Sequence, residues 1–560
     1  MSDANTIPRR DAATVMRLKR LGSLHQCRLS FMRTLTRRMA REEWVFGRPV
    51  FEIDDRGVGH AVYTASTGGR TYSLVAFAHD LPADQRSDRV IAEAWDTTFA
   101  LFDGVPTGDD IARLADNVPK QEAGRVSESE LTLSRANRSV RLWDHVVERL
   151  SSGQQPDTDL IDAVGYLMRT TAVYGSGKFG AADREVIADR PEVSGPFQAE
   201  MLTVYLIRIF VRDLVEHMAR ARGGDAAVAM DTRIARRLGI GNSTGLGMAP
   251  FIVNHPVLFN NWLMAREEAI SRVRSLAAAG ADEIARFREV LARAGVLVER
   301  WRTEHPIQTR KLADLTADVA RLAEHVASAD LSRDRPWDRL VRWSEGALTE
   351  EGQELVASLI LEPYGPLVDG LADCMADSNT TAFRIDGRMP VAEVRRLIAE
   401  RFDWALGQDW SARANCARAW YVSEEKLEPR LGERFEEPIE EYEQPLAPAR
   451  DAAAAFEALK GWEDAAPIAR FLLQHPEHRH VVRRAQIAPI APYGEIRDNT
   501  IGDTLLPIDM LRAKLSFFGA THFDPRSDRW VRVSMYAGAP YPEDLNAGTA
   551  DLWVYPDSAE

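Results

Sequence analysis

The stretch VFEIDDRGVGHAVYTASTGGRTYSLVAFAH (50–79) sets the expectation for the fold. β-Branched and aromatic residues dominate three pieces of it, a composition typical of strands. Two turn-forming groups, Asp55-Arg56-Gly57 and Thr67-Gly68-Gly69, separate these pieces. The stretch therefore predicts a three-stranded antiparallel meander near the N-terminus.

Beyond Arg86 the hydrophobic period becomes helical, and it stays helical to about Ala405. Ser127 followed by Glu130 matches a capping box, which predicts a helix that ends near Gly153. A long helix is expected from Ser194 to Gly223 and Gly224. The same periodicity predicts further helices at 256–279, 282–302, 308–329, 349–376 and 391–405.

The C-terminal part begins with a stretch rich in acid and proline, GERFEEPIEEYEQPLAPAR (432–450), which indicates a linker or surface excursion. WVRVSMY (530–536) and DLWVYP (551–556) then predict short strands. The predicted fold class is mainly α and α+β overall: a large multi-helix body with a small antiparallel meander near the N-terminus and short β elements near the C-terminus. The predicted domains are 1–84 with the meander, 85–430 as helical core, 431–450 as linker and 451–560 as an α+β region.

Composition narrows the class of protein. The 560 residues are 45% apolar and 28% charged, which excludes collagen-like and wholly disordered chains. A net charge of -14 argues against binding to nucleic acid or to an anionic membrane. Cys27, Cys374 and Cys416 form no CxxC pair, and the N-terminus has no apolar signal region. We therefore expect a cytoplasmic protein without a disulfide framework.

The heptapeptide YGSGKFG (174–180) is the first candidate site. Its three glycines let backbone amides approach an anion, and Lys178 adds positive charge and a group for proton transfer. A P-loop would need Gly at 172 and Ser or Thr at 179, whereas the chain has Ala172 and Phe179. The structural alternative is a glycine-rich helix end with a solvated lysine.

A second candidate is GIGNSTGLGMAPF (239–251). Glycines surround Asn242, Ser243 and Thr244, which predicts a flexible polar loop that closes over a small ligand. His255 follows and offers a titratable imidazole. The spacing is not GxGxxG, so no dinucleotide fingerprint is present, and an ordinary interhelix loop is the structural alternative.

Two arginines stand out by their surroundings. On a helix, Arg138 would share a basic face with neighbouring arginines, and this face is either solvated or an anion-binding wall. Arg208 lies between the apolar stretches LTVYLI and IFV, so its charge requires a partner. That partner is either a carboxylate from another helix or a ligand.

The histidines of HPEHRH (475–480) do not match HExxH, and His522 with Asp524 supplies only two metal ligands. We therefore expect neither a metal nor an organic cofactor. No GxSxG elbow, kinase signature or zinc-finger spacing is present in the sequence.

These features predict an enzyme of the lyase or isomerase type that acts on a small anionic metabolite, a carboxylate or phosphate, by metal-independent acid–base chemistry. The predicted catalytic residues are Lys178 and His255, and the predicted substrate-binding residues are Arg138, Arg208, Asn242, Ser243 and Thr244. One alternative is a noncatalytic helical assembly or regulatory protein whose apolar helix faces form a homo-oligomer. Another is a flavin- or nucleotide-binding enzyme with an unfamiliar pocket.

Overall fold

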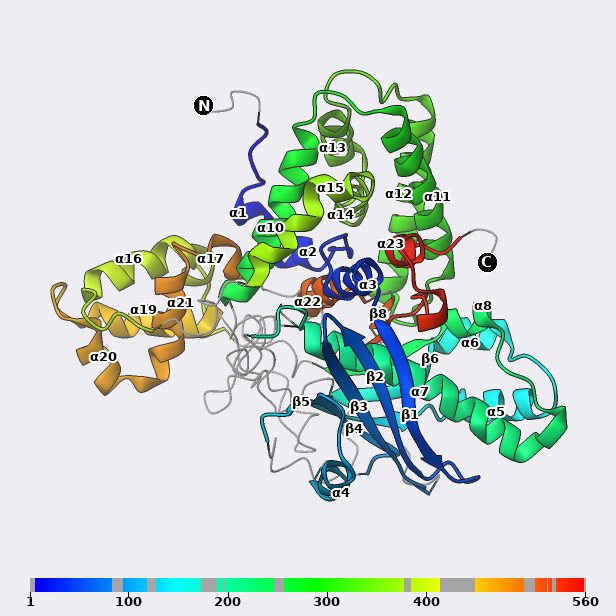
Figure 1. The fold of residues 1–560 in the computed structure, drawn as a ribbon. Helices are drawn as coiled ribbons and strands as arrows, with labels where there is room; N and C mark the ends of the chain where they lie inside the picture. The colour runs from blue at the N-terminus through cyan, green and yellow to red at the C-terminus, as the bar shows by residue number, and fades with distance from the viewer. Residues whose placement is uncertain are drawn as a thin grey trace.

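The computed structural model describes residues 6–82, 94–117, 127–172, 189–193, 195, 197–245, 256–376, 384–412, 449–497, 509–520, 522–525 and 530–557. Figure 1 shows a β-sheet at the lower centre, a large helical body above it and a smaller helical unit at the left. Segments from both ends of the chain, α3 (Phe31–Arg41) and α22 (Met510–Phe518), lie between the sheet and the helical body.

One mixed sheet of nine described strands organises the molecule, in the order β1-β2-β3-β4-β5-β6-β7-β9-β8. Its strands are β1 (Val45–Ile53), β2 (Gly59–Thr67), β3 (Arg70–Ala78), β4 (Thr97–Asp103), β5 (Glu130–Arg138), β6 (Tyr166–Ala172), β7 (Gly239–Gly245), β8 (His522–Pro525) and β9 (Trp530–Met535). Among these described strands only β6 and β7 run parallel, and every other neighbouring pair is antiparallel.

The predicted fold class, a mainly helical protein with only a small N-terminal meander, is wrong. The expected meander exists as β1, β2 and β3, but it is one third of a sheet that continues through β4 to β7 and takes in β9 and β8. Strands β4 to β7 come from the region that was expected to be helical. In the middle of a sheet, strands are covered on both faces, and their short apolar runs cannot be distinguished from helix by periodicity alone.

The segment 127–153 shows how the error arose. Ser127 Oγ donates to Glu130 Oε1 at 3.2 Å, but this bond joins two side chains, whereas a capping box joins each side chain to a backbone N–H. Glu130 begins strand β5, and the helix that follows, α5, spans only Trp143–Ser151. The expected basic face around Arg138 therefore does not exist, because Arg138 ends a strand and the next helix starts five residues later.

Helix α7 (Gln198–Gly223) crosses one face of the sheet and supplies much of the main core. Its Phe210 ring meets Phe99 of β4 edge to face, with centroids 5.6 Å apart. Thr203 Oγ1 lies 2.6 Å from Thr132 Oγ1 of β5. Full burial of one such aromatic side chain contributes about 1.5–3 kcal/mol, so this contact face fixes where α7 lies on the sheet.

The expected helices of the middle of the chain are confirmed with one exception. They form α10 (Pro256–Arg274), α11 (Ala281–Arg300), α12 (Pro306–Ser328), α16 (Val391–Arg401) and α17 (Asp403–Leu406). The exception is the single helix expected at 349–376, because α14 (Glu350–Leu359) covers only its first part and 3-10 segments with the short helix α15 (Gly365–Val368) follow. The stretch expected to be helical also contains α4 (Gly108–Asn117), α6 (Thr158–Val164), α8 (Thr232–Arg237) and α13 (Pro336–Ala347).

A smaller helical unit has its own hydrophobic core, built on residues such as Leu397, Phe402 and Phe471. It contains α16 and α17 together with α19 (Ala449–Lys460), α20 (Ile468–Gln474) and α21 (Arg479–Ile487), and it lies at the left of Figure 1. Residues 413–448, which include most of the predicted linker, lie outside the described residues.

The C-terminal strand predictions have opposite outcomes. WVRVSMY forms β9 as expected, whereas the prediction for DLWVYP is wrong, since α23 (Thr549–Leu552) and a following turn occupy it. In the described residues, one stretch, Glu350–Asp373, is long and apolar enough to cross a membrane, and 61% of its apolar window is buried inside the protein.

Candidate functional site

The two glycine-rich segments leave the sheet at the same edge. Thr170 of β6 pairs with Asn242 of β7, so these parallel strands end side by side at Ala172 and Gly245. The carboxyl ends of parallel strands are the usual ligand-binding edge of such sheets. Lys178 and His255, which follow these two ends, lie outside the described residues, so their catalytic roles stay predictions.

Asn242, Ser243 and Thr244 lie in strand β7 and not in the flexible loop that the sequence predicted. The Asn242 side chain is buried, and its Oδ1 has no hydrogen-bond partner among the described residues. A buried amide oxygen without a donor is costly, so a donor that reached it would stabilise this edge. Ser243 and Thr244 face β9 through backbone pairing, and their side chains lie outside the part described.

Arg138 and Arg208 lie at the opposite edge of the sheet, where β6 and β7 begin. Arg138 Nη2 donates to Gly57 O at 3.4 Å, and its guanidinium lies over the Trp143 ring, 5.1 Å from the centroid. The structure therefore does not bring these arginines to the edge from which the glycine-rich segments depart.

Arg208 is buried, as the sequence indicated, but backbone carbonyls replace the expected carboxylate. Its Nε donates to Leu238 O at 2.8 Å and its Nη1 to Ala539 O at 2.9 Å. Nη2 donates to Arg236 O at 3.2 Å, and the Tyr541 ring lies 4.0 Å from the guanidinium carbon. Arg208 thus ties two separate segments of backbone to α7.

These two segments form one wall of a solvent-filled hollow, which we call the arginine cleft. The cleft has about 820 Å³ of empty space, counting its open mouth. Its arginines are Arg233, Arg236 and Arg237 of α8 and Arg300 at the end of α11. Helices α6 and α8 and the C-terminal segment gather there, at the right of the sheet in Figure 1.

Part of the lining of the arginine cleft is apolar, and we call this part the apolar floor. It consists of Val164, Leu297, Trp301, Trp553 and Val554. A cavity with apolar walls and a few convergent polar groups is the usual form of a small-molecule site, because the walls hold the body of a ligand and the polar groups orient it.

Two glycines allow the cleft walls to approach each other. Gly165 has φ 80°, and a Cβ there would lie 2.7 Å from Ser534 Oγ. Gly538 has φ 90°, and a Cβ there would lie 2.4 Å from Trp553 O. Any other residue at either position would be strained and would push the walls apart.

Positive charge outweighs negative charge in the arginine cleft. Its lining holds four arginines and one acid, Asp162, whose Oδ2 lies 3.3 Å from Arg237 Nη1. Burial raises the pKa of Asp162 even though Arg237 and Arg300 act in the opposite direction. No protein-family model, curated protein or solved structure matches this chain. The chemistry of the arginine cleft is therefore the basis for inferring function.

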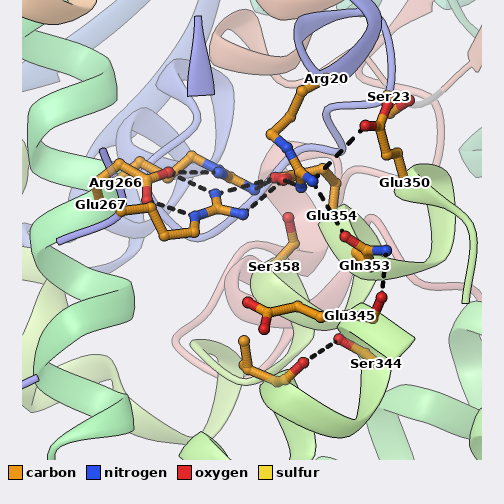
Figure 2. A network of polar contacts seen from close by, with 12 residues as sticks. Arg20, Ser23, Arg266, Glu267, Ser344, Glu345, Glu350, Gln353, Glu354 and Ser358 are labelled. Carbon is orange, nitrogen blue, oxygen red and sulfur yellow. Dashed lines mark hydrogen bonds and ion pairs between the residues drawn. The ribbon is translucent and has the colours of Figure 1, made fainter. Parts of the chain in front are cut away.

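A second concentration of charge is closed to ligands (Figure 2). Glu354 of α14 accepts from Arg10 and Arg20 of the N-terminal segment, both at 2.7 Å, and from Arg266 of α10, at 2.8 Å. Arg10 also binds Glu267 with two hydrogen bonds of 2.7 Å. The Arg266, Glu267 and Glu354 side chains have no exposed surface, so this ion-pair network anchors the N-terminal segment to the helical body.

The cluster HPEHRH contains the one group of described residues that could hold a metal ion. His475, Glu477 and His478 place a ligand atom each within 4.8 Å of one another. His475 Nδ1 lies 3.3 Å from Glu477 Oε1. Three ligands on one exposed turn can hold zinc with water as the fourth ligand, and the expectation of no metal stays a prediction.

The sequence analysis missed the arginines of the cleft although a signal was present. TRIARR (232–237) has three arginines in six residues, which is too many for so short a helix to neutralise by itself. The apolar floor gave no signal, because Trp301 and Trp553 are more than 200 residues apart and meet only in the folded chain.

Proposed function

We propose that the protein binds a small organic anion, a carboxylate or a phosphate ester, in the arginine cleft, and that Asp162 exchanges a proton with it. The observation that carries this proposal is that four arginines and the apolar floor line one hollow, whose lining holds a single acid. Arg236 also pairs with Asp544, which is not part of this lining, at 2.9 Å. The proposal keeps the sequence-based expectation of an enzyme for an anionic metabolite with lyase or isomerase chemistry, and it assigns the anion to different arginines.

Guanidinium groups suit this task because their fixed fork of donors matches the oxygens of carboxylate and phosphate. Arg237 and Arg300 are partly exposed, so an incoming anion reaches them without a large desolvation cost. Trp301 and Trp553 contribute wide apolar surfaces to the cleft. An anion with an apolar body should therefore bind better than a bare anion of the same charge.

Asp162 is the titratable acid of the cleft lining. A raised pKa brings a carboxyl closer to the operating pH, which favours its use as a general acid or base. A bound anion adds negative charge beside it and raises that pKa further. Anion binding should therefore be accompanied by proton uptake at Asp162. Lys178 and His255 remain the proton carriers proposed from sequence.

Isothermal titration calorimetry with benzoate tests the proposal, because benzoate carries an apolar ring and stays ionised at neutral pH. Benzoate should bind more tightly than acetate, and Arg237→Gln or Arg300→Gln should each weaken it by about 10-fold or more. Arg222→Gln is the matched control, since Arg222 is exposed at the end of α7, away from the cleft lining. Equal benzoate affinity in all three variants would refute the anion site.

Asp162→Asn separates binding from proton exchange. Removal of a like charge should tighten benzoate binding, while the proton uptake, measured in buffers of different ionisation enthalpy, should disappear. If Asp162→Asn retains the proton uptake of the unmodified protein, Asp162 is not the exchanging group. Tighter binding with no uptake in either protein would support binding without acid–base chemistry.

A further inference from the structure

A second basic hollow is lined by residues of α3 and α23. It has about 1090 Å³ of empty space, counting its mouth, and α3, α11, α23 and the 3-10 segment Asp369–Ala376 surround it. We call it the α3 pocket. Its five arginines are Arg28, Arg37, Arg38, Arg41 and Arg286.

Three of these arginines, Arg28, Arg286 and Arg37, have acidic partners in the pocket wall. Arg28 Nε and Nη2 each donate to Asp369 at 2.8 Å, and Arg28 Nη1 lies 2.8 Å from Asp551 Oδ1. Arg286 Nη2 lies 3.1 Å from Asp551 Oδ2. Arg28 and Arg286 therefore make the shortest ion pairs with Asp369 and Asp551, and the pairs of Arg37 with these two acids are longer, at 3.5 and 3.9 Å.

The Arg37 guanidinium is satisfied on one side only, where Nη2 donates to Arg28 O and lies 3.5 Å from Asp369 Oδ1. The side chain is 15% exposed, and its Nη1 has no hydrogen-bond partner in the described residues. The nearest acid oxygen to Nη1, Asp551 Oδ1, is 3.9 Å away. Burial and the charges of Arg28 and Arg33 lower the pKa of Arg37 to about 10. A buried N–H group without a hydrogen-bond partner lowers stability, so an acceptor that bound to Arg37 Nη1 would be favourable.

Arg38 and Arg41 also line the pocket, although Arg38 Nη1 donates to Glu192 O at 2.9 Å and Arg41 Nη2 to Glu42 Oε1 at 3.4 Å. They are one and four residues beyond Arg37 on α3, so Arg37 and Arg41 lie on one face of the helix. Arg41 is 72% exposed, and Asp373 lies exposed on the opposite rim. An acceptor with several oxygens could meet donors from successive turns of α3 at once.

We propose that the α3 pocket is a second anion site and that it binds a phosphate group. A phosphate offers more acceptor oxygens than a carboxylate, and arginine forks bind it with two parallel hydrogen bonds. The wall has no tryptophan and no large apolar floor, unlike the arginine cleft, so the pocket selects the anionic group and not an apolar body. The phosphate is either free or the ester of a small polar molecule.

Titration of the full-length protein with inorganic phosphate tests this site. Arg37→Gln and Arg41→Gln should each weaken phosphate binding, Arg37→Gln by about 10-fold. Asp373→Asn should tighten it by about 2- to 5-fold, because the variant removes a like charge from the rim. The change in opposite directions excludes a general loss of folding as the cause. Arg41→Gln and Asp373→Asn alter exposed side chains and keep the test valid if Arg37→Gln fails to fold.

Cleft variants distinguish this site from the proposed function. Arg237→Gln should lose benzoate binding and keep phosphate binding, whereas Arg37→Gln should do the reverse. Loss of phosphate binding in Arg237→Gln alone, or equal phosphate affinity in all the α3 pocket variants, would overturn the second site. Glycerol 3-phosphate that binds more tightly than inorganic phosphate identifies an ester as the ligand, and the opposite order identifies free phosphate.

Discussion

Arginine has different roles in the ion-pair network and in the arginine cleft. In the network, three arginines, Arg10, Arg20 and Arg266, surround two buried glutamates, and Glu350 lies 3.8 Å from Arg20. In the cleft, four arginines line the hollow with one aspartate, and Arg236 also pairs with Asp544 at 2.9 Å. Where acidic side chains equal the arginines in charge, the arginines stabilise the fold. Where arginines outnumber the acids, the arginines indicate a ligand site.

The physical reason is desolvation. A charge that leaves water loses several kcal/mol of hydration, so a closed site must return this energy through paired charges and hydrogen bonds. A cleft keeps its arginines partly hydrated, so an excess of positive charge is tolerated there until an anion binds. Substitutions in the ion-pair network should therefore mainly lower stability, whereas substitutions in the arginine cleft should mainly weaken binding.

Glu354→Gln should have the largest effect on stability. It removes the carboxylate that three arginines share and leaves their charges buried, which costs about 3–5 kcal/mol of unfolding free energy. Urea denaturation measures the loss. Glu350→Gln is the matched control, because its side chain is 27% exposed, and Arg237→Gln in the cleft should likewise cost less than about 1 kcal/mol. Similar losses in all three variants would break the comparison.

Acid should weaken a second closed network, which contains Glu351. Burial alone would raise the pKa of Glu351, but Arg512 and His25 outweigh it and hold this pKa at about 2, below the ordinary 4.5. A depressed carboxyl pKa contributes stability that is complete above pH 4.5 and is lost as the pH falls toward 2.

For Glu351 this loss should be roughly 3 kcal/mol, and Glu351→Gln should remove that part of the pH dependence. Urea denaturation as a function of pH measures both. An unchanged pH profile in Glu351→Gln would show that other acids control the acid sensitivity.

Arg208→Gln should lower both the stability of the fold and the affinity for benzoate, and its effect on stability should be smaller. Glutamine cannot reach all three carbonyls that Arg208 binds, so the loss should be about 1–3 kcal/mol. Because all three carbonyls belong to the cleft wall or lie next to it, benzoate affinity should fall as well. Denaturation and benzoate titration of the same preparation measure the two effects. Unchanged benzoate affinity would show that Arg208 stabilises the fold without positioning the cleft.

The sequence predicted the parts of the fold that depend on local pattern. Helices α10, α11 and α12 have long amphipathic repeats, and β1 to β3 have alternating residues between glycine turns. Strands β4 to β7 were missed because their neighbours in the sheet, and not their own composition, make them strands. GIGNSTG in β7 is the clearest case. Five of its seven residues are glycine, serine or threonine, and four of these five pair with β9.

For the candidate site, the sequence predicted the kind of side chain involved, arginine, but not which arginines come together. The sequence alone established an arginine-rich protein in which Arg208 is buried and requires partners, because a guanidinium between apolar stretches of one helix has no local acceptor. The tertiary structure decided which arginines share a hollow. Arg237, Arg300 and Trp553 come from three distant segments, and the charge balance around each arginine depends on neighbours that only chain folding brings within a few ångströms.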